Sequence, residues 1–114
     1  MSRTRQQEKG DDAEARAVAA LAARGLVIVS RNARVGRGEL DVVARDGDVV
    51  VFVEVRRRRT RVDALESITT RKRRTLVATA TRWLAAHAPE ARARFDVVVV
   101  VDARVEHIVD AFSV

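Results

Sequence analysis

The chain has 114 residues, 47% of them hydrophobic and 33% charged, a composition typical of one folded domain with a modest core. It contains no cysteine, so disulfide bonds, thiolate zinc sites and thiol nucleophiles are excluded. Its 22 lysine and arginine residues exceed its 16 acidic residues, and the net charge of +6 favours a polyanionic partner, nucleic acid above all. A GC-rich coding genome would also enrich arginine over lysine, so the charge is supporting evidence only.

The N-terminal segment is polar and carries no targeting signal. No stretch of the chain approaches the roughly 18 consecutive apolar residues of a membrane span, and the first residues lack the apolar core of a signal peptide. We therefore expect a cytoplasmic protein without membrane contact. Residues 1–10 are expected to form a flexible tail, followed by a single domain over residues 11–114.

The first predicted element is a helix that Asp11 or Asp12 caps and that runs to about Arg24, where Gly25 ends it. Its apolar residues recur at helical spacing and form one stripe. Glu14 lies at the head of that stripe instead of on the opposite face. The helix therefore directs one carboxylate toward the side that it buries.

Three strands are expected next, the first over residues 26–34. The second and third, residues 39–45 and 48–56, flank Asp46 and Gly47, which form a strong signal for a tight hairpin. Both of these strands are rich in valine, with acidic residues as interruptions. Since acidic residues are rare inside strands, the interruptions call for an explanation.

The acidic residues of this hairpin are Glu39, Asp41 and Glu54. If Arg45 pairs with Asp48, Glu39 faces Glu54, and Asp41 becomes the diagonal neighbour of Glu54 at about 7–8 Å. Burying like charges together is costly unless a cation lies among them. The pattern therefore predicts a site for Mg²⁺ or Mn²⁺. The alternative is a solvated sheet face on which the three acids pair with surrounding arginines.

Arg56 lies two residues after Glu54 and projects to the same face of the predicted strand. A guanidinium there can stabilise the negative charge that builds on a reacting phosphate. It cannot act as a general base, because arginine keeps its proton at working pH.

A second helix is expected from about residue 69 to residue 87, and Pro89 ends it. Basic runs at residues 56–59 and 71–74 follow the predicted site and open this helix. Charge runs are usually solvated faces, but two runs at one end of an acidic pocket fit a nucleic-acid backbone, which such contacts position without reading sequence. The residues expected to hold this backbone are Arg57, Arg58, Arg71, Lys72 and Arg73.

Residues 95–101 are almost continuous valine and predict a strand covered on both faces, and residues 105–109 fit a final edge strand. For Asp96 an ordinary structural pairing is favoured over membership of the acidic cluster, and for Trp83 core packing is favoured over base stacking. The predicted order α-β-β-β-α-β-(β) describes a single α/β domain with a mixed central sheet flanked by helices.

Together these motifs resemble the PD-(D/E)XK nuclease core, whose fold is α-β-β-β-α-β. The chain more closely resembles the YraN family of small bacterial proteins, which are related in fold to Holliday-junction resolvases. The resemblance covers nearly all of residues 10–112. It is carried by Glu14, Gly25, Arg31-Asn32, Gly38-Glu-Leu-Asp41, Val51-Phe-Val-Glu-Val55, Lys72 and Arg94-Phe-Asp96.

The resemblance implies a restriction-endonuclease-like domain in which Asp41 and Glu54 bind the metal. It implies that Glu14 reaches the site from the first helix and that Glu39 assists or neighbours it. Arg56 stands where the usual motif has lysine, a departure that bears on activity and not on the fold. By analogy with resolvases, which need two sites to cut two strands, the resemblance also fits a homodimer.

The first hypothesis is therefore a Mg²⁺- or Mn²⁺-dependent endonuclease acting on nucleic acid, with DNA as the expected substrate. Its catalytic residues would be Asp41, Glu54, Arg56 and Glu14, and its metal ligands Asp41, Glu54 and Glu39. One alternative is a nucleic-acid-binding module on the same fold without turnover. Another is an adaptor that joins larger DNA- or RNA-processing complexes and uses its charge only for docking.

Overall fold

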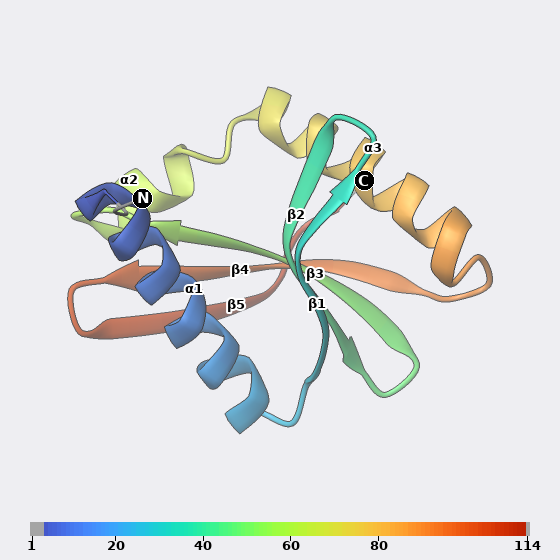
Figure 1. Ribbon diagram of the computed structural model, residues 1–114, viewed down its shortest axis with the longest axis horizontal. Helices are drawn as coiled ribbons and strands as arrows, with labels where there is room; N and C mark the ends of the chain where they lie inside the picture. Colours follow the sequence, from blue (N-terminus) through green and yellow to red (C-terminus); the bar gives the residue numbers. More distant parts are fainter. Residues whose placement is uncertain (1–3, 114) are drawn as a thin grey trace.

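The computed structural model describes residues 4–113 as a five-stranded mixed sheet with helices on both faces (Figure 1). The strands lie in the order of the sequence; β3 and β4 are parallel, and all other neighbours are antiparallel. Within the described part of the chain, no helix is both long and apolar enough to cross a membrane. The elements are α1 (Arg5–Ala23), β1 (Val27–Val35), β2 (Gly38–Asp46), β3 (Val49–Arg57), α2 (Arg61–Glu66), α3 (Thr70–His87), β4 (Ala93–Val101) and β5 (Arg104–Phe112).

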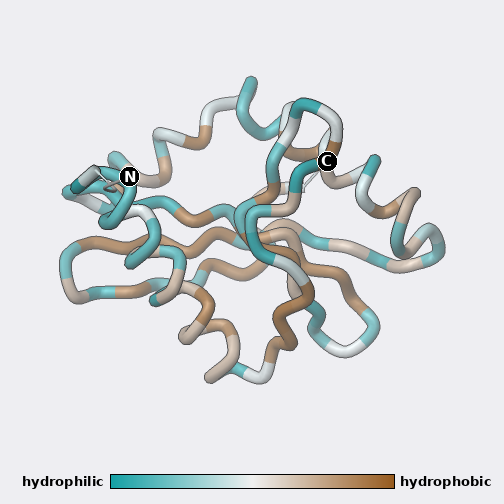
Figure 2. Tube along the Cα trace, viewed as in Figure 1, coloured by the Kyte–Doolittle hydropathy of each residue, from teal (hydrophilic) through white to brown (hydrophobic). Residues whose placement is uncertain are grey.

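The predicted α/β class and the order of helices and strands are confirmed. β3 and β4 are hydrophobic where they cross the middle of the molecule, whereas the middle of β1 is polar, and further polar residues gather at the turns and helix ends (Figure 2). The structure adds α2, which the sequence analysis did not predict, in the crossover between β3 and α3. Its N-cap is Thr60, whose Oγ1 accepts a hydrogen bond from Asp63 N at 3.1 Å.

The first helix begins earlier than predicted. Thr4 is its N-cap: Thr4 Oγ1 accepts a hydrogen bond from Gln7 N at 3.1 Å, and Gln7 Oε1 accepts one from Thr4 N at 2.9 Å. These reciprocal bonds form a capping box, which satisfies two of the amides at the start of the helix. The expected flexible tail over residues 1–10 is therefore wrong from Arg5 onward, and residues 1–3 lie outside the described part of the chain.

Each face of the sheet is buried by different helices. α1 covers one face through Ala13, Ala17 and Leu21, which are spaced four residues apart, while α2 and α3 cover the other. β4 runs between both layers: Val97 packs with α3, and Val98 packs with α1. The predicted burial of this valine strand on both faces is confirmed.

The hairpin of β2 and β3 forms, but its register differs by two residues from the prediction. Asp46 pairs with Val49, whereas the prediction placed Arg45 opposite Asp48. The two turn residues are therefore Gly47 and Asp48. Gly47 has φ +59°, and a glycine at the first turn position suits the two-residue turns that match the twist of a hairpin. The shift preserves the faces of the sheet but changes which acids are neighbours.

Gly38 allows the start of β2 to lie directly against α3. A Cβ at Gly38 would overlap the side chain of Thr79, and the Thr79 hydroxyl is held by a hydrogen bond to the Thr75 carbonyl at 2.9 Å. We expect Gly38→Ala to lower the free energy of unfolding by about 1–3 kcal/mol, as measured by urea denaturation. Adding Thr79→Ala removes the two closest atoms, Oγ1 and Cγ2, and should restore part of the loss. An equal loss in the double variant would contradict this account.

Candidate active site

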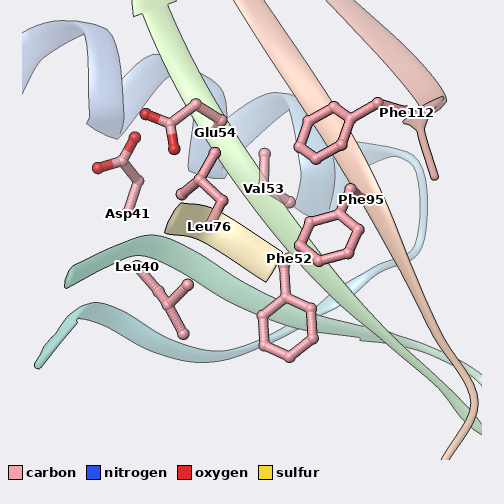
Figure 3. Close-up of a pocket in the computed structure, with 8 residues that line it drawn as sticks. All are labelled: Leu40, Asp41, Phe52, Val53, Glu54, Leu76, Phe95 and Phe112. Carbon is pink, nitrogen blue, oxygen red and sulfur yellow. The ribbon is translucent and has the colours of Figure 1, made fainter. Parts of the chain in front are cut away.

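Asp41 of β2 and Glu54 of β3 direct their carboxylates toward one another at the edge of a small apolar cavity (Figure 3). The ladder between these strands ends at the pair Val42 and Val53. Just beyond it, Asp41 Oδ2 accepts a hydrogen bond from Val55 N at 2.9 Å. The Asp41 side chain thus takes the place of a backbone acceptor at the end of the ladder. This contact fixes its carboxylate at the level of Glu54.

Glu54 is buried, with 6% of its surface exposed. Burial raises the pKa of its carboxyl group from 4.5 to about 7, and the neighbouring Asp41 carboxylate adds to the rise. The positive charges of Arg56 and Lys72 act in the opposite direction. In the absence of a further cation, Glu54 therefore holds its proton well above the pH at which an exposed glutamate loses it, and it is about half protonated near pH 7.

The raised pKa of Glu54 predicts that the metal-free protein loses stability as the pH rises from about 4.5 to about 7. Across this interval Glu54 has ionised in the unfolded chain but still holds its proton in the folded one. The folded state binds more protons, so this group lowers the free energy of unfolding by at most about 1.4 kcal/mol per pH unit.

Urea denaturation in EDTA at pH 5 and pH 7.5 measures this effect. Glu54→Gln cannot ionise, so its unfolding free energy should vary less between the two pH values than that of the unsubstituted protein. The same pH dependence in both proteins would assign the proton to another group.

Arg56 lies on the same face as Glu54, as predicted, and its Nη2 lies 3.1 Å from Glu54 Oε1. The Arg56 side chain is 14% exposed, and its Nε is buried without an acceptor among the described residues. A buried donor without a partner costs roughly 1–3 kcal/mol, so proteins seldom retain one without a reason. The guanidinium thus contacts an acid through one nitrogen, while another nitrogen is buried without an acceptor among the described residues.

Glu14 of α1 lines the same cleft as Asp41 and is close enough for the Asp41 charge to act on it. Glu14 Oε1 accepts hydrogen bonds from Asn32 Nδ2 at 2.9 Å and from Arg31 Nε at 3.3 Å, both on β1. Burial raises the pKa of Glu14 and the Asp41 carboxylate raises it further, against the lowering effect of Arg31 and Asn32. The sequence analysis gave Arg31 and Asn32 no role. The sequence pointed to these two residues only as one of the motifs that carry the family resemblance.

Glu39 is exposed and does not face Glu54. The predicted opposition of these two acids is wrong, because the two-residue shift of the hairpin brings Asp41 to that level instead. Among residues 4–113, no group of three or more histidine, cysteine, aspartate or glutamate side chains is placed to hold a metal ion. The acidic site is therefore the pair Asp41 and Glu54, with Glu14 in the same cleft as Asp41.

The predicted nucleic-acid-binding residues lie in two places, the end of β3 and the first turns of α3. Arg57 and Arg58 line a cleft that also reaches Glu14 and Asp41. Lys72, in the first turn of α3, is half-buried and close enough to Glu54 to lower its pKa.

The remaining two basic residues of this set belong to the first turns of α3 and are exposed. The Arg73 guanidinium lies over the ring of Phe112, 5.4 Å from its centroid, which gives it a packing role that the sequence did not show. For Arg71, the structure provides exposure only. Of the five predicted residues, the structure therefore brings Arg57, Arg58 and Lys72 to the acidic site.

Asp96 is fully buried and has an ordinary structural role, as the sequence analysis favoured. Arg94 donates to both of its oxygens, with Nε–Oδ1 at 3.0 Å and Nη2–Oδ2 at 3.2 Å. His107 Nε2 lies 2.7 Å from Oδ2, and Asp110 N donates to Oδ1 at 2.9 Å. Trp83 is likewise a packing residue, meeting the ring of Phe52 edge-on at a centroid distance of 5.7 Å.

Comparison with known proteins gives one consistent result. Residues 13–100 match the family described as "Uncharacterised protein family UPF0102". A UPF0102 protein of Acidiphilium cryptum (strain JF-5) is 43% identical over 113 residues, which cover 97% of this chain and 88% of that protein. One of Anaeromyxobacter dehalogenans (strain 2CP-C) is 46% identical over 114 residues, covering 94% and 85%. One of Pseudomonas aeruginosa (strain LESB58) is 50% identical over 97 residues, covering 82% and 78%.

Proposed function

The chain belongs to the UPF0102, or YraN, family, and we propose that it is a metal-dependent nuclease that binds and hydrolyses nucleic acid, DNA in the first place. The observation that carries this proposal is the contact of two carboxylates, Asp41 and Glu54, with the pKa of Glu54 raised to about 7. The contact raises the pKa of Glu54 and therefore does not stabilise its ionised form, and carboxyl groups with such raised pKa values are concentrated at functional sites. The resemblance to the PD-(D/E)XK core points to the same chemistry.

The donor set fits Mg²⁺ or Mn²⁺. Mg²⁺ is usually bound by one or two carboxylates and completes its shell with water and substrate oxygens. Asp41 and Glu54 would be those carboxylates, and the cleft that Asp41 lines would admit the remaining ligands. When bound, such a cation activates water and neutralises the departing oxygen. Glu14, held by β1, would orient groups on the Asp41 side, and the exposed Glu39 is outside this set.

Arg56 would bind the reacting phosphate. Its Nε is a buried donor without an acceptor among the described residues, while its Nη2 is anchored on Glu54. Charge-assisted hydrogen bonds from a fixed guanidinium stabilise the negative charge that grows on phosphate oxygens during attack. Because arginine keeps its proton, Arg56 would hold charge and would not transfer a proton.

A second candidate function is nucleic-acid binding without hydrolysis. The ion pair of Arg56 with Glu54 favours it, because the guanidinium already supplies Glu54 with a positive partner. In this case Arg57, Arg58 and Lys72 would hold a phosphate backbone beside an acidic pair that binds no metal. An adaptor that only docks onto larger complexes is the remaining alternative.

A cleavage and binding assay separates these functions. Branched and linear DNA, and RNA of the same sequence, are incubated with the protein in Mn²⁺, Mg²⁺ or EDTA. We expect cutting in either metal and none in EDTA. We expect Arg56→Ala to slow it by about a hundredfold or more and Arg56→Lys to retain most of it. Cutting that persists in Glu54→Gln would identify a contaminating nuclease. Binding without cutting would support the second function, and the absence of both would support the adaptor.

A further inference from the structure

The first turns of α1 form one wall of a cleft of about 350 Å³ that reaches the acidic site. The opposite wall comes from the end of β3 with Arg57 and Arg58, and both Glu14 and Asp41 line the cleft. Figure 1 shows the start of α1 beside this end of the sheet, and Figure 2 shows polar residues gathered there. The polar sequence of residues 1–10 predicts a tail, so this wall of the cleft is visible only in the structure.

The lining carries both signs of charge, with three basic residues and three acidic ones, Asp11, Glu14 and Asp41. Lys9 from α1 joins Arg57 and Arg58 in supplying positive charge for phosphate oxygens. Gln6 supplies a side-chain amide, which can hydrogen-bond to the edge of a base. None of the described residues that line the cleft is aromatic, but guanidinium planes also stack on unpaired bases.

Gly10 gives an independent indication. It lies inside α1, where glycine weakens a helix, and it lines the cleft. A Cβ at Gly10 would meet no atom of residues 4–113 within 4 Å, and its φ is not positive, so neither packing against these residues nor backbone conformation requires a glycine there. A side chain at this position would instead project into space beside the cleft. Glycine leaves the helix backbone accessible to a ligand.

We propose that this cleft holds one unpaired nucleotide, next to the phosphodiester bond that lies at Asp41 and Glu54. The inference rests on the proposed function and specifies its substrate class as strands with unpaired nucleotides: single strands, overhangs and branch points. A cleft of this volume is near the lower end of ligand sites and accepts one nucleotide. Bases stacked inside a blunt duplex cannot enter it without leaving the stack.

The test is fluorescence anisotropy in EDTA, so that no strand is cut, with a labelled single strand and a blunt duplex of the same sequence. We expect the single strand to bind at least about tenfold more tightly than the duplex. Gly10→Ala should weaken single-strand binding about fivefold or more and leave duplex binding unchanged. The same substitution should raise the melting temperature by about 2–5 °C, because alanine favours the helix. A loss of binding in a more stable protein cannot be attributed to unfolding.

Two further variants complete the design. Lys9→Ala should reduce the preference for the single strand, whereas Arg92→Ala, which removes an exposed charge outside the cleft lining, should change both affinities equally or not at all. Equal affinity for both DNAs in the unsubstituted protein, or unchanged binding in Gly10→Ala, would overturn the inference. Cutting in Mn²⁺ without such a preference would leave the proposed nuclease standing and reject only the nucleotide cleft. A preference for the single strand without any cutting would support the nucleotide cleft and reject the proposed nuclease activity.

Discussion

Replacing Asp41 by asparagine is expected to weaken metal binding strongly and to abolish cleavage while leaving the fold intact. The asparagine carbonyl can still accept the hydrogen bond from Val55 N, which Asp41 Oδ2 accepts at 2.9 Å. The substitution removes one of the two charges that would attract the cation, and carboxylate oxygens are the ligands that Mg²⁺ and Mn²⁺ prefer. Titration calorimetry with Mn²⁺ should show affinity at least about a hundredfold weaker, and the cleavage assay should show no product.

Glu39→Gln is the matched control for Asp41→Asn. It removes one acidic charge from the same strand, two residues away, at an exposed position that does not face Glu54. We expect its Mn²⁺ affinity to remain within about threefold of that of the unsubstituted protein, because an exposed charge is screened by solvent. If Glu39→Gln lost as much affinity as Asp41→Asn, Glu39 would belong to the ligand set and the register argument would fail.

The largest effect on stability is expected from Asp96→Ala. The Asp96 carboxylate is fully buried and accepts hydrogen bonds from Arg94 and from Asp110 N, with His107 at 2.7 Å. Removing it leaves a guanidinium, a buried imidazole and a backbone amide without their acceptor. Breaking a buried charged pair at one partner costs about 3–5 kcal/mol. Urea denaturation of the metal-free protein measures the change in unfolding free energy.

Asp46→Ala provides the comparison, because it removes a second carboxylate from the same Arg94. Asp46 Oδ2 accepts from Arg94 Nη1 at 2.8 Å, but its side chain is 52% exposed. Ion pairs at exposed positions contribute about 0–1 kcal/mol, so this variant should be nearly as stable as the unsubstituted protein. Similar losses in both variants would show that burial does not decide the contribution of these pairs.

The sequence predicted the order of elements because valine runs, turn residues and helical spacing are local signals. It missed the start of α1, where a capping box formed by Thr4 and Gln7 lies in a segment that looks like a polar tail. It also misplaced the hairpin register, because Asp46-Gly47 and Gly47-Asp48 are both plausible turn pairs, and only the folded strands select between them. An error of two residues left the faces of the sheet intact, so the fold class survived it.

The sequence predicted which residues belong to the candidate site better than it predicted the residues that they contact. Acidic residues inside valine strands identified Asp41 and Glu54, because their placement conflicts with strand propensity. The partners of these residues come from elsewhere in the chain: Lys72 from α3 acts on Glu54, and the Glu14 beside Asp41 is held by β1. Similarly, Arg73 meets Phe112 across a separation of 39 residues, so no local pattern could assign it to packing.

The hydrogen bond between Asp41 and Val55 has an evolutionary consequence. Its donor is a main-chain amide, so almost any amino acid at position 55 provides the same N–H. Only proline lacks that group. The orientation of the Asp41 carboxylate therefore depends on the backbone of β3 and not on the side chain at position 55. Substitutions at position 55 during evolution can change the neighbouring surface without disturbing that carboxylate.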